Sequence, residues 1–107
     1  RALRDWCWDH YADPDDRAEP KASPMLADSL AGLPPAVVVT AEFDPLRDEG
    51  DAYATAMAAA GVDVTHIRGR GQMHTSITAT NAIISSGSIR ADIAAGVRGF
   101  FSEVARV

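Results

Sequence analysis

The chain has 107 residues, of which 47% are hydrophobic and 23% are charged, and its formal net charge is −5. This length suits one small core, and the acidic balance excludes nucleic acid and anionic membrane surfaces as partners, because both bind a basic face. No apolar run approaches the roughly 20 residues of a membrane span. A single cysteine, Cys7, excludes an internal disulfide framework or a cysteine-based metal site. We expect Cys7 to be buried and the protein to be cytoplasmic.

The first 35 residues are predicted to form a connecting region rather than part of a sheet. The chain opens at Arg1 without an initiator methionine, and we therefore expect it to be a piece of a longer protein. Residues 3–11 are aromatic-rich and predict one or two helical turns. Residues 12–24 are dense in Asp and Pro and predict an irregular loop, and a further turn follows at 30–35.

Residues 36–67 have the pattern of a strand, a helix and a second strand. Residues 36–41 are continuously apolar and β-branched, which is typical of a parallel strand buried on both faces. Apolar and small residues recur at helical spacing over 45–60, after Asp44 as N-cap and before Gly61 as the stop. The polar residues of this helix, including Asp51, are predicted to lie on its outer side. Residues 62–67 predict a short strand near a sheet edge.

The remaining residues predict a loop and helices. Residues 68–74 hold two glycines and predict a loop, and 75–84 are predicted to be helical. A final helix follows Gly87, and its predicted inner stripe is Ile89, Ile93, Val97, Phe100, Phe101 and Val104. Residues 36–107 thus form a strand–helix–strand–helix unit, which indicates an α/β fold with a parallel sheet and requires further strands beyond this chain.

Asp44 and His74 are predicted to meet at one edge of this sheet. The two strands of a crossover run in the same direction, so residues that follow their carboxyl ends emerge at the same edge, where ligands bind in open α/β folds. An aspartate that orients a histidine is half of a nucleophilic triad. By spacing alone, however, the commoner role of Asp44 is a helix cap, and that of His74 is a solvated loop residue. His10 and His66 have no such partner in the pattern.

The sequence around Asp44 closely resembles one family. A Gly-Leu-Pro-Pro lead-in at 32–35, a buried strand and Asp-Pro-Leu-Arg-Asp-Glu-Gly at 44–50 occur in the order seen in the hormone-sensitive-lipase-like carboxylesterases, bacterial family IV. Gly-Gln-Met-His at 71–74 is similar to the family's Gly-x-x-His loop. Trp-Asp-His-Tyr at 8–11, Asp-Arg at 16–17 and Ala-Ser-Pro at 22–24 also match the family. The likeness covers nearly the whole chain.

The resemblance implies the C-terminal portion of an α/β-hydrolase fold, with the last parallel strands and helices of a sheet covered on both faces. It maps the triad acid onto Asp44 and the triad base onto His74, and it implies no metal or organic cofactor. The expected activity is hydrolysis of small carboxylic esters with short or medium acyl chains. A homodimer through the edge strand near residues 62–68 is in keeping with the family.

Two features depart from the family pattern. Many members follow the histidine with Gly-Phe, whereas this chain has Thr-Ser-Ile at 75–77. The nucleophile elbow Gly-Asp-Ser-Ala-Gly and the oxyanion loop His-Gly-Gly-Gly, which lie upstream in the family, are absent. No Gly-x-Ser-x-Gly frame surrounds any serine of the chain, at Ser23, Ser29, Ser76, Ser85, Ser86, Ser88 or Ser102. We therefore expect the chain to need the missing N-terminal portion of the fold and to be inactive alone.

Two alternatives to an esterase stay open. A hydrolase-fold receptor or ligand-binding module keeps the architecture without the chemistry, although the presence of both Asp44 and His74 favours an enzyme. An unrelated α/β binding domain would use Asp44 only as a cap. An upstream Gly-Asp-Ser-Ala-Gly in the same protein would exclude that second alternative.

Overall fold

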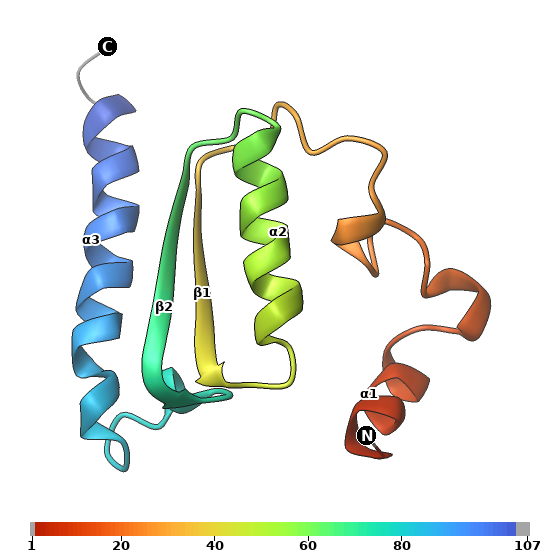
Figure 1. Cartoon of the computed structure of the whole chain (residues 1–107), viewed down its shortest axis with the longest axis horizontal. Helices are drawn as coiled ribbons and strands as arrows, with labels where there is room; N and C mark the ends of the chain where they lie inside the picture. Colours follow the sequence, from red (N-terminus) through yellow and green to blue (C-terminus); the bar gives the residue numbers. More distant parts are fainter. Residues whose placement is uncertain (1, 105–107) are drawn as a thin grey trace. The chain divides into compact units, whose positions relative to one another are not determined.

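The computed structural model describes residues 2–104 and divides the chain into two compact units, one up to Leu30 and one from Ala31 onward. The first unit contains helix α1 (Ala2–Tyr11). The second contains strand β1 (Ala36–Phe43), helix α2 (Arg47–Ala59), strand β2 (Val64–Met73) and helix α3 (Gly87–Val104) (Figure 1). No helix within residues 2–104 is both long and apolar enough to cross a membrane.

In the first unit, Arg17 ties the segment after α1 back to the helix. Its guanidinium donates to the Ala12 carbonyl over 3.1 Å and pairs with the Asp9 carboxylate over 2.7 Å. The Ser23 hydroxyl in turn donates to the Arg17 carbonyl over 2.6 Å. Asp9, Arg17 and Ser23 belong to the three short motifs before residue 25, so these contacts explain why the motifs occur together.

The prediction that Cys7 is buried was wrong, because its side chain is exposed. The side of α1 that packs in this unit is the one beside Arg17, whose guanidinium also lies 5.9 Å from the ring centre of Trp8. Cys7 does not lie on that side. Apolar character and flanking aromatics therefore did not determine its burial.

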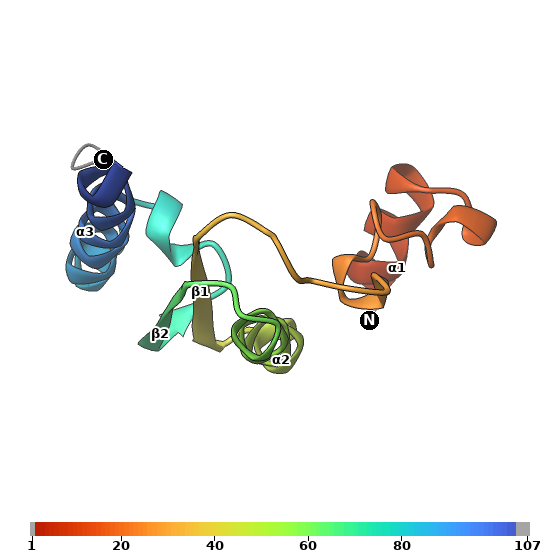
Figure 2. The ribbon, with the colours of Figure 1, turned by 90° about the horizontal axis from the view of Figure 1, so that it is seen from above.

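In the second unit, β1 and β2 pair in parallel, with register from Ala36 opposite Val64 to Ala41 opposite Gly69. Helices α2 and α3 cover opposite faces of this pair (Figure 2). A Cβ placed at Gly50 of α2 would lie 2.8 Å from the Thr40 side chain. A Cβ at Gly96 of α3 would lie 3.1 Å from the Val37 side chain, whose position three residues earlier puts it on the other face. The α/β fold with a doubly covered parallel sheet is confirmed.

The structure differs from the prediction in α3. Ile89 is buried and Ile93 half-buried, as expected, but Val97 and Phe101 are 40% and 72% exposed. The helix instead packs against β1 through Gly96. Val97, the next residue, therefore points away from the centre of this contact. The side chain of Val104, the last member of the predicted stripe, lies outside the described side chains.

The predicted loop at 68–74 was also wrong, because β2 continues to Met73. Between Ala41–Phe43 of β1 and the facing Gly69–Met73 of β2, β1 advances two residues and β2 advances four, which is an irregular bulge. Gly71 within it has a φ of +71°, a value that L side chains rarely adopt. The two glycines that indicated a loop therefore permit a bulged strand.

Two boundaries moved as well. Helix α2 begins at Arg47 rather than at residue 45, because residues 44–46 form a turn. The segment 75–84 is not a regular helix: single 3-10 turns lie at Ser76–Thr78 and Ile84–Ser86. Thr75, with a φ of +60°, interrupts any helical path from β2.

Candidate active site

Asp44 lies directly after β1 and holds the turn that leads into α2. Its Oδ1 atom accepts a hydrogen bond of 2.8 Å from the Leu46 amide, and its carbonyl accepts one of 3.1 Å from the Arg47 amide. The Asp44 side chain is only 13% exposed. The capping role indicated by the sequence is therefore present, although it acts on the turn before the helix.

His74 lies directly after β2, and its Nδ1 atom is 2.7 Å from Oδ2 of Asp44. The two oxygens of Asp44 thus serve different partners, one holding the turn and the other the imidazole. The His74 side chain is 55% exposed, and Nε2 makes no hydrogen bond to any residue that the structure describes. Residues 30 positions apart therefore meet at the carboxyl end of the two strands.

The surroundings of Asp44 keep its carboxyl group ionised. Burial opposes ionisation, but the hydrogen bonds from the Leu46 amide and from His74, together with the charge of His74, outweigh it and lower the pKa of Asp44. An ionised carboxylate only accepts hydrogen bonds, so the proton of this contact belongs to Nδ1 of the imidazole. In the neutral imidazole, Nε2 is therefore the nitrogen with the lone pair, and a general base needs that lone pair to accept a proton.

Gln72 fixes the turn that carries His74. Its side chain is 4% exposed, and its amide oxygen accepts a 2.9 Å hydrogen bond from the buried Ser76 hydroxyl. The amide nitrogen donates to the Ser85 hydroxyl over 3.2 Å. Gln72 and Ser76 therefore bracket the histidine from two residues before and two residues after. The sequence motif Gly-x-x-His had indicated no role for this glutamine.

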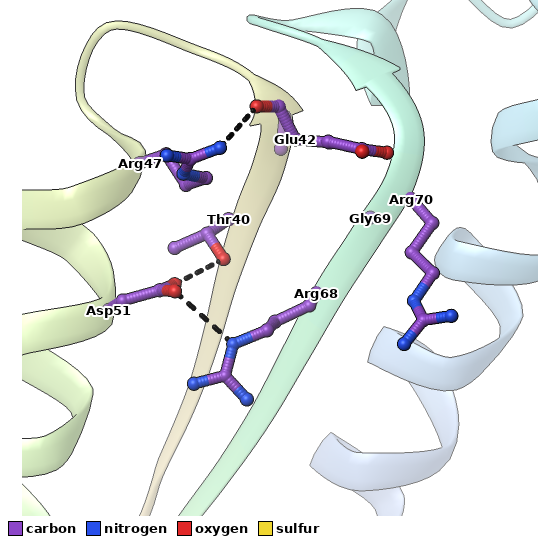
Figure 3. Close-up of a pocket in the computed structure, with 8 residues that line it drawn as sticks. Thr40, Glu42, Arg47, Asp51, Arg68, Gly69 and Arg70 are labelled. Carbon is purple, nitrogen blue, oxygen red and sulfur yellow. Dashed lines mark hydrogen bonds and ion pairs between the residues drawn. The ribbon is translucent and has the colours of Figure 1, made fainter.

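A second polar cluster joins α2 to the sheet, and sequence reasoning missed it. Asp51, predicted to lie on the outer side of α2, instead accepts a 2.7 Å hydrogen bond from the Thr40 hydroxyl. It also pairs with Arg68 over 3.2 Å (Figure 3). The His66 imidazole lies 3.1 Å from the same carboxylate. The pKa of Asp51 is lowered, chiefly by the hydrogen bond from Thr40 and then by Arg68 and His66. Burial acts in the opposite direction but is outweighed. The glycine at position 50 was the feature of the sequence that could have indicated this cluster. It lets α2 approach Thr40 closely, and this approach brings Asp51, the next residue, to the sheet.

A shallow pocket of about 190 Å³ lies beside this cluster, and Asp44 and His74 do not line it. Two of its three arginines are paired with carboxylates, Arg68 with Asp51 and Arg47 with Asp48. In this cluster the Thr40 hydroxyl donates its hydrogen bond to the Asp51 carboxylate. His66 therefore does not accept the hydroxyl proton and does not activate Thr40 as a nucleophile. Within residues 2–104, no three acidic, histidine or cysteine side chains are arranged to hold a metal ion.

Comparison with known proteins shows which family the chain belongs to. The model of the alpha/beta hydrolase fold family matches residues 1–78, which include both Asp44 and His74. The chain belongs to this α/β hydrolase family. The hormone-sensitive-lipase-like resemblance is confirmed by relatives and structures that are esterases.

Two of the matched relatives are a carboxylic ester hydrolase and an arylesterase. The chain is 55% identical to the carboxylic ester hydrolase LipN of Mycobacterium tuberculosis over 62 residues, which are 56% of this chain and 16% of LipN. It is 45% identical to an arylesterase of Saccharolobus solfataricus over 65 residues, covering 61% of this chain and 21% of that enzyme.

Two solved structures share the fold. An esterase of Pyrobaculum calidifontis superposes with a TM-score of 0.76 at 38% identity, covering 83% of this chain and 29% of that one. An α/β hydrolase from the metagenome of Lake Arreo superposes with a TM-score of 0.75 at 41% identity, covering 89% and 30%. The chain thus spans less than a third of the length of each relative and structure described here.

Proposed function

We propose that this chain supplies the acid and the base of a serine esterase whose nucleophile lies in another part of the protein. The observation that carries the proposal is the 2.7 Å contact between His74 Nδ1 and Asp44 Oδ2 at the carboxyl end of two parallel strands. The absence of a Gly-x-Ser-x-Gly frame and the short span of the match to esterases support the division of the triad.

In the proposed reaction, His74 Nε2 takes the proton of the serine hydroxyl while the serine oxygen attacks the ester carbonyl. The tetrahedral intermediate collapses to an acyl-serine, and His74 returns the proton to the departing alcohol. Water then attacks the acyl group with the same help from His74 and releases the carboxylic acid. Asp44 holds the imidazole in the Nδ1–H form and stabilises its charged state. No metal or organic cofactor takes part.

The substrate class that we propose is small carboxylic esters, in keeping with the relatives' names. The 107 residues alone would hydrolyse such esters poorly, because the serine and the oxyanion donors are outside them. Their partner would be the remainder of the same fold.

The test is hydrolysis of p-nitrophenyl butyrate by the full-length protein, with the variants His74→Ala and His10→Ala. His10 is a matched control, because it is exposed and, within residues 2–104, its ring contacts Trp6 in the same helix, through a 2.8 Å hydrogen bond to the carbonyl and ring stacking at 4.2 Å. His74→Ala should lower kcat by about 10⁴-fold, while His10→Ala should behave as wild type. An inert wild type, or a fully active His74→Ala, would refute the esterase and favour the binding module.

A further inference from the structure

We propose that Glu42 is a positioning residue for His74, an inference that rests on the proposed function. Glu42 and Asp44 are two residues apart at the end of β1, and both carboxylates reach across to the end of β2. Glu42 Oε2 accepts a 2.6 Å hydrogen bond from the Gly71 amide, as Asp44 Oδ2 accepts one from His74 over 2.7 Å. Figure 3 shows the Glu42 side chain extended from β1 toward β2.

The bulge in β2 gives Glu42 this role. Because β2 advances four residues where β1 advances two, the residues between Gly69 and Met73 lose the regular pairing with β1. The Gly71 amide donates to the Glu42 side chain instead, over 2.6 Å. The side chain of Glu42 thus takes the place of a strand partner at the point where β2 turns toward His74.

Glu42 is itself held in place, whereas the ring of His74 has few restraints of its own. The Glu42 carbonyl accepts a 3.1 Å hydrogen bond from the Arg47 guanidinium, which ties the end of β1 to the first turn of α2. His74 is 55% exposed, and within the described part of the chain its ring bonds only to Asp44. The position of Nε2 therefore depends on the backbone that carries the ring. Gly71 lies three residues earlier on that backbone, and a displacement of about 1 Å at a reacting group can cost about 10²-fold in rate.

Two substitutions separate the reach of this side chain from its charge. In the full-length protein, Glu42→Gln keeps an oxygen at the same distance and removes the charge, while Glu42→Asp keeps the charge and is one methylene too short for Gly71. With p-nitrophenyl butyrate we expect kcat of Glu42→Asp to fall by about 10- to 100-fold with KM unchanged. Glu42→Gln should retain most of kcat. A role of the charge alone would give the opposite order.

Asp48→Ala is the matched control, because it removes the other partner of Arg47, over 2.8 Å, without touching Gly71. It should leave kcat unchanged. The inference is overturned if Glu42→Asp matches the wild type, if Glu42→Gln falls below Glu42→Asp, or if both variants lose the folded state by circular dichroism. An inert wild type would instead refute the proposed function. If the wild type is active and His74→Ala is inert, the proposed function stands, and the Glu42 variants then test the positioning role alone.

Discussion

Replacing Gly50 with alanine tests how closely α2 packs on the sheet, because two effects predict opposite signs. Alanine in place of glycine inside a helix is favourable by about 1 kcal/mol. The new Cβ, however, would lie 2.8 Å from Cγ2 of Thr40, well inside an ordinary contact. Overpacking of this kind costs about 1–3 kcal/mol.

The cost rises if Thr40 has to turn away. Its hydroxyl is committed to the Asp51 carboxylate over 2.7 Å, and loss of a hydrogen bond to a charged group costs about 1.5–3 kcal/mol. We therefore expect Gly50→Ala to destabilise the full-length protein by a net amount of about 2 kcal/mol, measured by urea unfolding.

Thr40→Ser is the matched second substitution, since it removes Cγ2 and keeps the hydroxyl that binds Asp51. In that background Gly50→Ala should cost much less, so a double-mutant cycle should give a coupling energy of about 1–2 kcal/mol. A Gly50→Ala protein that is more stable than the wild type would refute the close approach of α2 to β1.

Two further changes probe the groups around the site. Gln72→Leu leaves the hydroxyls of Ser76 and Ser85 without their partner, so it should lower the free energy of unfolding by about 1–3 kcal/mol. Adding Ser76→Ala should recover part of the loss, and equal stability of Gln72→Leu and wild type would contradict this. Asp51 has a lowered pKa, so its stabilisation is complete above the unfolded value of about 3.9 and is lost as pH falls through the folded value. In urea titrations the stability difference between wild type and Asp51→Asn should therefore stay constant from pH 7 to about pH 4 and shrink as the pH falls further. A difference that stays constant below about pH 4 would rule out this linkage.

The sequence alone predicted the parts of this chain that depend on local patterns. A continuous apolar run specified β1, and helical spacing specified α2 to within two residues of its start. The meeting of Asp44 and His74 followed from the shared direction of the two strands, which brings their carboxyl ends to one edge of the sheet. Their catalytic role stays a prediction until the nucleophile is joined to them.

Only the tertiary structure decided how those elements touch. Within the bulge in β2, the Gly71 amide donates to a carboxylate from another strand, Glu42, and no local pattern of glycines reveals this contact. The inward position of Asp51 follows from the approach of Gly50 to Thr40, and the exposure of Val97 follows from the approach of Gly96 to Val37. Periodicity places a side chain only to within the width of a helix face, whereas these contacts depend on tenths of an ångström between elements distant in sequence.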